Sequence, residues 1–263
     1  MAELVHYATA NGVATITLDS PHNRNALSAQ LRRELRDHLA TAAGDDAVRV
    51  VVLDHTGPVF CAGMDLKEAG STGSATDGVN EFPEILTQIW TSRKPVVAKL
   101  AGPARAGGVG LVAAADIAVA SDDAKIGFTE ARLGILPAVI SPYVVMKLGA
   151  GQARRWFVTG SRMDAREALA IGLVHRVVPR ADLEKAAHEM AFEVLQCAPG
   201  AVAACKELVE DVVGGLALAS SLEDGFADVK SYTAQRIAQA RVSAEGQEGM
   251  KAFLEKRKPR WAQ

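Results

Sequence analysis

Short apolar stretches, each bounded by turn-forming residues, characterise the first part of the chain. Residues 7–9 and 13–18 flank the dipeptide Asn11-Gly12, which suits the positive φ angles of a tight turn. The two stretches therefore predict a β-hairpin. Residues 49–54 and 95–100 are almost entirely apolar. Strands of that kind are buried on both faces, which is typical of parallel strands covered by helices.

Helical periodicity accompanies these strands. Ser28 is placed to cap a helix that runs through Leu39, and one face of that helix carries Leu27, Leu31, Leu35 and Leu39. Two further strands are predicted at residues 116–120 and 174–178. The Gly/Ser/Thr/Asp-rich residues 70–78 predict a mobile surface loop, and residues 130–138 are also loop-like.

Helix dominates from residue 164 onward, apart from the strand at 174–178. Pro199-Gly200 marks a boundary, after which the chain is predicted to form three helices. The fold class is therefore α/β, with a mixed core over residues 1–199 and a helical C-terminal region over residues 200–263. No internal repeat of fixed period is present in the sequence.

Composition narrows the class of protein. With 263 residues and 49% hydrophobic content, the chain is long enough for one main hydrophobic core. The net charge of -2 provides no general attraction to nucleic acid. No apolar run is long enough to span a bilayer, and the N-terminus lacks the features of a signal peptide. We expect a protein that does not bind nucleic acid or membranes.

The spacing of the cysteines and histidines indicates the redox state of the compartment and whether a metal site is expected. The three cysteines form no CxxC pair and leave an odd thiol, so a reduced cytoplasmic compartment is the simplest interpretation. The six histidines are scattered, and none has a partner at zinc-ligand spacing. We therefore expect no metal site.

Two glycine-containing turns follow buried strands and end at predicted helix starts. In residues 56–68, the small residues Cys61, Ala62 and Gly63 allow a ligand to approach the backbone. Asp65 suits the first turn of a helix, which would leave the amides around Met64 as unpaired donors.

The second turn, residues 102–110, leads into an apolar helix at 111–115. Free amides and the helix dipole at such a start favour developing negative charge. Two donors that converge on one oxygen make an oxyanion hole. On spacing alone, the alternative stays open that both turns only pack a helix against a sheet.

Residues 108–113 also fit the dinucleotide-binding pattern G-x-G-x-x-A. The context does not suit that pattern, because at least five residues separate the preceding strand from the first glycine. The pattern also does not open the first strand–helix–strand unit of the chain. It is therefore a weak indication.

Five ordered segments together resemble the enoyl-CoA hydratase/isomerase (crotonase) superfamily, over nearly the whole chain. They are residues 23–28 (NRNALS), 60–68 (FCAGMDLKE), 106–108 (AGG) followed by Asp116-Ile117, 129–137 (TEARLGILP) and 249–257 (GMKAFLEKR). They are similar, in order, to the family patterns N-A-L-S, F-C-A-G-x-D-L-K-E, G-G-G…D-I, P-E…L-G-I-x-P and E-G-x-x-A-F-x-E-K-R. Alanine stands at the first glycine of the third pattern.

The resemblance implies a spiral of ββα turns and a helical C-terminal region that forms trimers, usually paired into hexamers. It implies an acyl-coenzyme A thioester as substrate, with no separate cofactor, and places the oxyanion amides at Met64 and Gly107. The residues implied to line the coenzyme A path are Ala26, Ala62, Asp65, Leu66 and Lys67, with Phe253 and Lys256 touching the nucleotide end. A solvated helix-surface position is the alternative for Lys67.

The catalytic acids depart from the pattern of two-acid hydratases. Gly110 stands where their first glutamate would be, and Glu130 matches the second. Glu130 is therefore the predicted acid/base group, to protonate Cα and orient water in a hydratase or to move a proton between Cα and Cγ in an isomerase. Burial near the thioester would raise its pKa. The alternative is a surface Glu130 paired with Arg132.

Residues 107–116 and 127–144 are more specifically similar to bacterial methylglutaconyl-CoA hydratases of leucine breakdown and to the related isoprenoid-catabolic hydratases, whose substrates carry a distal carboxylate. Arg105 is the candidate cation for that carboxylate, or else only pins its own loop. Ser141 and Tyr143 are candidates to hold water in place of the missing acid, unless both simply begin a helix.

The first prediction is thus an enoyl-CoA hydratase that adds water across the 2,3 double bond, and the nearest alternative is a Δ3-Δ2 enoyl-CoA isomerase. RNA binding is a third class, but Arg32, Arg33 and Arg36 alternate with acidic residues and predict a solvated helix face. A non-catalytic subunit is a fourth, against which the retained Glu130 argues.

Overall fold

The computed structural model describes residues 2–65, 67–68, 75–219 and 221–262. The chain divides into two compact units, Met1–Ala191 and Phe192–Gln263. The first unit contains the β-sheets and the second is helical. Each unit is described separately below.

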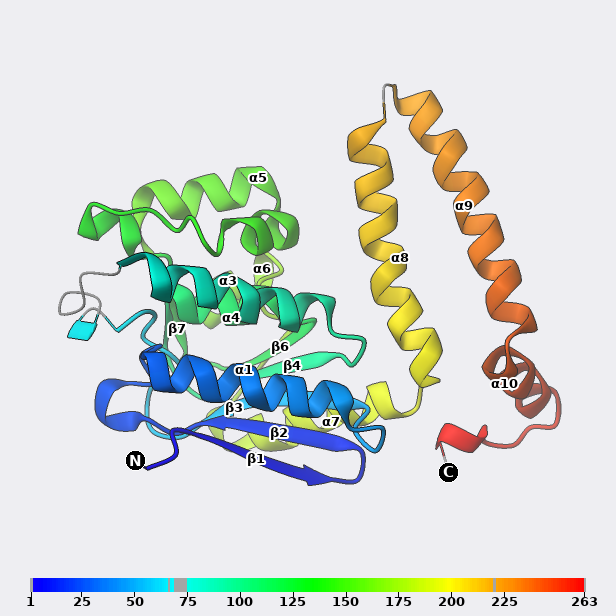
Figure 1. The fold of residues 1–263 in the computed structure, drawn as a ribbon, viewed down its shortest axis with the longest axis horizontal. Helices are drawn as coiled ribbons and strands as arrows, with labels where there is room; N and C mark the ends of the chain where they lie inside the picture. The colour runs from blue at the N-terminus through cyan, green and yellow to red at the C-terminus, as the bar shows by residue number, and fades with distance from the viewer. Residues whose placement is uncertain (1, 66, 69–74, 220, 263) are drawn as a thin grey trace. The chain divides into compact units, whose positions relative to one another are not determined.

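A six-stranded sheet forms the centre of the first unit (Figure 1). Its strands, in spatial order, are β1 Val5–Ala10, β2 Val13–Leu18, β3 Val50–His55, β4 Val96–Leu100, β6 Ile117–Ser121 and β9 Arg176–Val178. The β1–β2 pair is antiparallel and the other pairs are parallel. The hairpin turns at Asn11 and Gly12, both with positive φ. The predicted hairpin and the parallel arrangement of the two apolar strands are confirmed.

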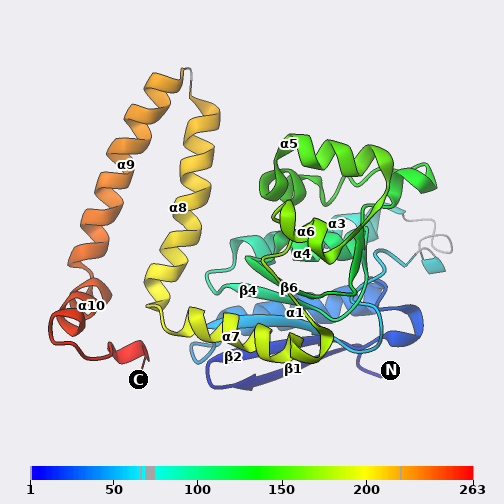
Figure 2. The same cartoon turned by 180° about the vertical axis from the view of Figure 1, so that it is seen from behind.

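Helices cover both faces of this sheet (Figures 1 and 2). On one face lie α1 Ala29–Gly44, α3 Ala75–Thr91 and α4 Gly107–Ala114, which share one hydrophobic core with alternate residues of the strands. The Ser28 side chain accepts a hydrogen bond from the Leu31 N–H and caps α1, and the four predicted leucines are buried. Helix α7, Leu183–Leu195, lies along the opposite face. The central strands β3 and β4 are therefore buried on both faces, whereas the edge strand β1 is largely exposed.

A smaller three-stranded sheet stands beside the large one and carries the segments that lead to the candidate site. It consists of β5 Ala104–Arg105, β7 Lys125–Gly127 and β8 Arg162–Asp164. Strand β5 runs parallel to β7, and β8 pairs with β7 in the antiparallel sense. The 3-10 helix η2 Glu130–Leu133 follows β7, and helices α5 Ser141–Thr159 and α6 Ala165–Ala170 complete this part of the unit.

Two predictions for this unit are wrong in detail. Residues 75–78 were predicted as loop but belong to α3, while residues 70–74 lie outside the described part of the chain. Residues 75–78 are helical despite their loop-like composition, because the later turns of α3 bury Phe82, Ile85, Leu86 and Ile89 in the core. Helix α4 begins at Gly107, four residues before the predicted start.

Arg32 is also placed differently from the prediction. Its side chain was expected on a solvated face, yet Arg32 is only 5% exposed. Its guanidinium donates to the Leu27 carbonyl at 2.6 Å and pairs with Glu81 at 3.2 Å. Arg36 pairs with the same Glu81. Helical spacing alone could not show that Glu81, from helix α3, lies beside this face of α1 and neutralises its positive charge.

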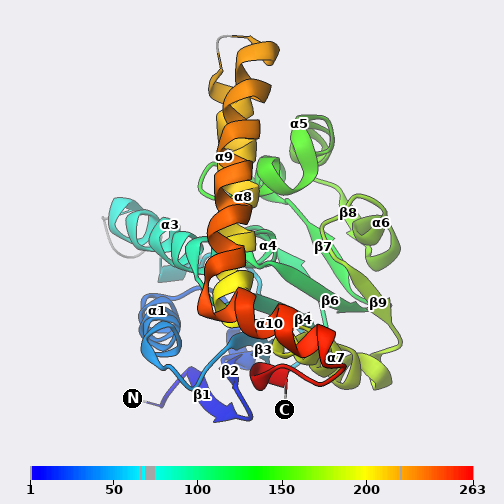
Figure 3. The ribbon, with the colours of Figure 1, turned by 90° about the vertical axis from the view of Figure 1, so that its right-hand side faces the viewer.

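The second unit is built from helices, as predicted after Pro199-Gly200. They are α8 Pro199–Leu218, α9 Leu222–Val242 and α10 Ala244–Leu254, followed by a short 3-10 turn. Helices α8 and α9 run side by side as a hairpin in Figure 1, and α9 covers α8 in the view of Figure 3. Large apolar side chains are exposed along this unit, among them Val209, Phe226 and Phe253. Trimer or hexamer formation stays a prediction. Within the described residues, no helix has the length and apolar character to cross a membrane.

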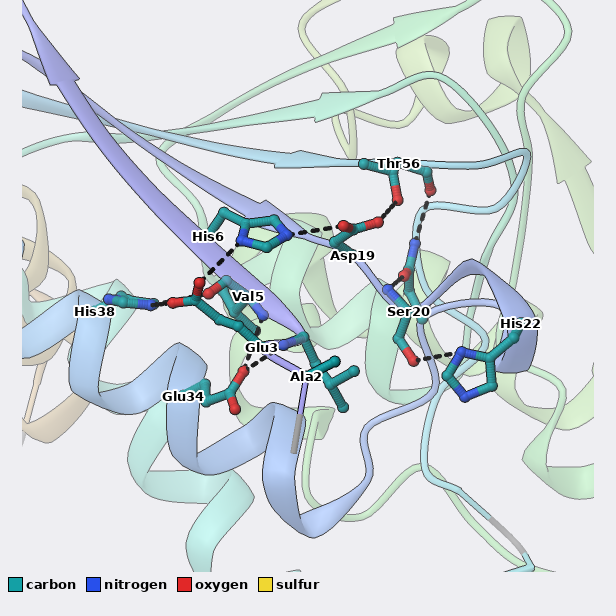
Figure 4. A network of polar contacts seen from close by, with 12 residues as sticks. Ala2, Glu3, Val5, His6, Asp19, Ser20, His22, Glu34, His38 and Thr56 are labelled. Carbon is teal, nitrogen blue, oxygen red and sulfur yellow. Dashed lines mark hydrogen bonds and ion pairs between the residues drawn. The ribbon is translucent and has the colours of Figure 1, made fainter.

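A polar network ties the edge strand β1 to its neighbours (Figure 4). His6 Nε2 lies 2.8 Å from Asp19 Oδ2, and the Thr56 hydroxyl donates to the same carboxylate. His6 Nδ1 lies 3.2 Å from Glu3. The hydrogen bond to Asp19 is the largest cause of the raised His6 pKa. The Asp19 pKa is lowered, chiefly by Thr56 and then by His6.

We expect this network to stabilise the fold most when His6 is protonated. Because the pKa of His6 is raised in the folded state, the contribution is present below about pH 6.5 and is lost as the pH rises through the folded-state pKa. Asp19→Asn should lower the His6 pKa in an NMR titration and reduce the change in Tm between pH 6 and pH 8. An unchanged His6 titration in Asp19→Asn would contradict this role.

Candidate active site

Three backbone segments, far apart in the sequence, meet at the candidate site. The Leu27 N–H donates to the Gly63 carbonyl at 2.8 Å, and Leu27 and Met64 form a parallel bridge. The next segment joins through a bridge between Cys61 and Ala104 and a 2.9 Å bond from the Arg105 N–H to the Cys61 carbonyl. The two glycine-containing turns predicted from sequence are therefore hydrogen-bonded neighbours.

Asn25 anchors the first of these segments, although its place in the sequence does not predict this role. Its side chain is fully buried. The amide nitrogen donates to the Thr56 and Val59 carbonyls at 3.0 and 2.8 Å, and the amide oxygen accepts from the Ser20 N–H at 2.7 Å. Residues 20–25 are mostly polar, so no local pattern distinguishes Asn25, and its role follows from the three hydrogen bonds that its burial requires.

Two backbone N–H groups at this junction have no acceptor among the described residues. They belong to Met64 and to Gly107, the first residue of α4. Gly63 lies between them: a Cβ at Gly63 would be only 3.2 Å from the Gly107 nitrogen and 3.1 Å from the Arg105 carbonyl. The helix start adds the positive end of the α4 dipole. The arrangement provides two free donors on adjoining loops.

Close packing explains why small residues stand here. A Cβ at Gly107 would lie 2.9 Å from Leu27 Cδ1, and a Cβ at Gly108 would lie 2.5 Å from the Cys61 carbonyl oxygen. Ala106, where the family pattern has glycine, has φ 47° and ψ −119°. An L-residue in such a conformation costs about 1–3 kcal/mol. The backbone leading into Gly107 is therefore held under strain.

Glu130 begins η2, and two residues separate it from the end of β7. The Ala106 N–H donates to the Gly127 carbonyl at 3.1 Å, so the strand that leads to Glu130 is tied to the loop that leads to Gly107. Gly134, with φ 73°, ends η2 and lets its N–H reach back to the Ala131 and Glu130 carbonyls. This tight turn fixes the backbone of Glu130.

The Glu130 side chain is buried and incompletely bonded. It is 6% exposed, and its Oε2 has no hydrogen-bond partner. Burial raises the pKa of this carboxyl, partly offset by its own backbone N–H. The alternative of a surface Glu130 paired with Arg132 is wrong, because Arg132 is exposed and packs beside Gly160. A buried carboxyl with a free oxygen is suited to moving a proton.

Position 110, which lacks the first acid, is filled by hydrocarbon. A Cβ at Gly110 would be 2.4 Å from Ile140 Cγ2. The two candidates for holding water are bonded elsewhere. The Ser141 hydroxyl donates to the Ala138 carbonyl at 2.8 Å, and the Tyr143 hydroxyl lies 2.8 Å from the Thr87 hydroxyl.

The coenzyme A candidates of the first unit lie around the Met64 loop. Ala26 is buried, Ala62 is half-buried, and Lys67 is exposed. Asp65 has a structural task, because its Oδ1 accepts the Lys67 N–H at 3.0 Å and its Oδ2 accepts from Asn23 at 3.3 Å. Leu66 lies outside the described residues.

Two further candidates, Phe253 and Lys256, belong to the second unit. Phe253 is 82% exposed at the end of α10. Lys256 is exposed and has φ 53°. Their contact with the nucleotide end of a substrate stays a prediction.

The Arg105 side chain is hydrogen-bonded in the way expected if it holds its own loop in place. Its guanidinium donates to the Lys125 carbonyl at 2.9 Å. Lys125 is the first residue of β7, and Glu130 lies beyond the other end of that strand. Burial, and next the charge of Arg162, lower the Arg105 pKa. No carboxylate among the described residues pairs with Arg105. Its guanidinium therefore retains free donors.

The sequence matches the family described as enoyl-CoA hydratase/isomerase over residues 8–263. The chain belongs to the enoyl-CoA hydratase/isomerase family. It is 34% identical to carnitinyl-CoA dehydratase of Proteus mirabilis, over 99% of both chains. Among solved structures, it is 31% identical to an enoyl-CoA hydratase from Shewanella pealeana, with a TM-score of 0.89 over 98% of this chain and 96% of the other. It is 38% identical to Pseudomonas aeruginosa AtuE, with a TM-score of 0.87 over 99% and 100%.

Family membership confirms the expected fold class. The mixed sheet with a helical C-terminal region matches crotonase structures, and an acyl-CoA thioester substrate is consistent with the family. The relatives cited above do not carry the name methylglutaconyl-CoA hydratase, so that narrower assignment stays a proposal. Among the described residues, no group of three or more His, Cys, Asp or Glu side chains is arranged to hold a metal ion.

Proposed function

We propose that this family member catalyses the reversible addition of water to the 2,3 double bond of an acyl-CoA thioester. The observation that carries the proposal is the buried Glu130 carboxyl, whose Oε2 has no partner. Strand pairing ties its segment to the loop that presents the Gly107 N–H. One acid/base group and two free amide donors are the parts that enolate chemistry on a thioester requires.

The reaction uses each part in turn. The N–H groups of Met64 and Gly107 bind the thioester oxygen and withdraw electrons from the double bond, which makes the β-carbon electrophilic. The Glu130 carboxylate takes a proton from water while the water oxygen bonds to the β-carbon. Negative charge then rests on the thioester oxygen between the two amides. Glu130 returns a proton to Cα, which restores the thioester and regenerates the carboxylate.

Isomerisation is the second candidate, because one carboxylate also suffices for it. Glu130 would remove a proton from Cα of a 3,4-enoyl thioester and deliver it to Cγ, with the same two amides holding the enolate oxygen. The hydrocarbon at Gly110 and Ile140 is compatible with that reaction. The two candidates differ in whether the product gains an oxygen atom.

The choice of substrates follows from the relatives. Dehydration of a carnitinyl thioester, the reaction in the name of the Proteus relative, is the reverse of hydration and would use the same groups. Methylglutaconyl-CoA is the narrower proposal from sequence, with the unpaired Arg105 as the cation for its distal carboxylate. These thioesters define the panel to test.

The test is turnover with product analysis. Crotonyl-CoA, methylglutaconyl-CoA, carnitinyl-CoA and a 3,4-enoyl-CoA are incubated in ¹⁸O-labelled water, and the acyl products are identified by mass spectrometry. We expect the label in a 3-hydroxyacyl product from at least one 2,3-enoyl thioester. Migration of the double bond without label would establish the isomerase instead. If methylglutaconyl-CoA is the substrate, Arg105→Ala should reduce its turnover more than that of crotonyl-CoA.

A further inference from the structure

The glycine at position 110 does not leave an empty place. An added Cβ would lie 2.4 Å from Ile140 Cγ2, 3.1 Å from Ile140 Cβ and 3.5 Å from Leu86 Cδ1. Ile140 is 2% exposed and Leu86 is fully buried. A β-branched side chain has few rotamers in which it could move aside. Gly110 and Ile140 are therefore packed as a complementary pair, between α4 and the residue preceding α5.

The groups next to this pair supply no replacement for an acid. Ser141, which follows Ile140, uses its hydroxyl on the Ala138 carbonyl. Tyr143 contacts the Thr87 hydroxyl and the Pro83 carbonyl, and so joins α5 to α3. Leu86 provides a further apolar contact. Hydrocarbon therefore lines the side of the site that adjoins Gly110.

We infer that Ile140 is a specificity-determining residue, which closes the Gly110 side of the site to a second carboxylate and to any water that such a carboxylate would hold. The inference rests on the proposed function. It restricts the site to reactions in which Glu130 makes both proton movements. Activity should then depend on the ionisation of one group: it rises with pH as Glu130 loses its proton and then stays level.

The packing part of the inference is tested by thermal unfolding. Gly110→Ala adds the Cβ that meets Ile140, and we expect Tm to fall by about 2–10 °C from overpacking. Ile140→Gly removes the opposing methyl groups and creates a cavity, so it should also lower Tm. The double variant Gly110→Ala/Ile140→Gly should be more stable than the sum of the two losses predicts. Additive losses in Tm would overturn the pairing.

The chemical part is tested with Gly110→Glu/Ile140→Gly, which gives a second carboxyl room to enter. We expect its pH profile to become bell-shaped, because one carboxyl must now be ionised and the other protonated. On the Glu130→Gln background, the same two changes should raise the residual hydration rate at least tenfold over Glu130→Gln alone. Ile140→Gly with Gly110 intact is the matched control and should keep the single-limb profile.

The outcomes separate this inference from the proposed function. If the native protein converts no thioester of the panel, the proposed function fails. The Tm measurements still test the packing of Gly110 against Ile140. If the native protein is active and the folded Gly110→Glu/Ile140→Gly variant keeps a single-limb profile, Ile140 does not determine the reaction and the inference is overturned.

Discussion

Glu130→Gln should lower kcat/KM for thioester hydration by about 10³-fold, within the usual range for losing a general acid–base group. Glutamine keeps the size of the side chain but cannot take a proton from water and return it to Cα. The donors at Met64 and Gly107 are unaffected, so KM should change much less than kcat. Steady-state kinetics on whichever thioester the native protein converts gives both values.

A stability measurement distinguishes loss of chemistry from loss of fold. Because burial raises the pKa of Glu130, the folded state binds a proton more tightly than the unfolded state does. Its contribution to stability is therefore lost as pH rises from about 4.5 through the folded-state pKa. Glu130→Gln removes this dependence and should be at least as stable as the native protein at pH 8. The exposed Glu193→Gln is the matched control, expected to change neither rate nor Tm.

Retention of activity would refute the mechanism. If folded Glu130→Gln turns over within threefold of the native rate, another group moves the proton, and both the hydratase and the isomerase proposals lose their central residue. A drop in rate together with a large fall in Tm would instead assign Glu130 a structural role.

Local sequence signals predicted the parts of the fold that depend on near neighbours. The Asn11-Gly12 turn, the leucine face of α1 and the Ser28 cap all follow from residues within a few positions of each other. The apolar runs at β3 and β4 also predicted parallel pairing, because burial on both faces shows in a strand's own sequence.

Features that depend on distant contacts were not predictable in the same way. Arg32 looks like a surface residue until Glu81 of another helix is placed beside it. The residues after position 75 have a loop-like composition but are helical, because α3 buries an apolar face in the core. Asn25 owes its role to two carbonyls more than 30 positions away. Each of these outcomes depends on which groups tertiary packing brings together.

The candidate site shows the same division. Sequence identified Met64, Gly107 and Glu130 through a family resemblance, and it showed that position 110 lacks an acid. It did not show which side chain fills the space beside position 110, because Ile140 is 30 positions further along the chain and no local pattern distinguishes it. The free oxygen of Glu130 is likewise a property of the folded surroundings.

Gly63→Ala should have the second-largest effect, because it separates the two loops that carry the amide donors. Gly63 has φ 88°, and its added Cβ would lie 2.9 Å from the Ala106 Cβ and 3.2 Å from the Gly107 nitrogen. Relief of that contact moves Gly107 away from Met64, so one donor no longer reaches the oxygen. Loss of one such donor lowers kcat by about 10²–10³-fold. Steady-state kinetics with a folded variant measures this loss.

Gly172→Ala provides the matched control, since Gly172 has a similar φ of 79° but an added Cβ would meet nothing within 4 Å. Both substitutions place alanine in a strained conformation, which costs about 1–3 kcal/mol, so both should lower Tm, and Gly63→Ala should lower it further because of its contact with Ala106. Only Gly63→Ala should lower kcat. Equal kcat losses in the two variants would attribute the effect to destabilisation, whereas a selective loss shows that the separation of the Met64 and Gly107 loops sets the strength of the oxyanion hole.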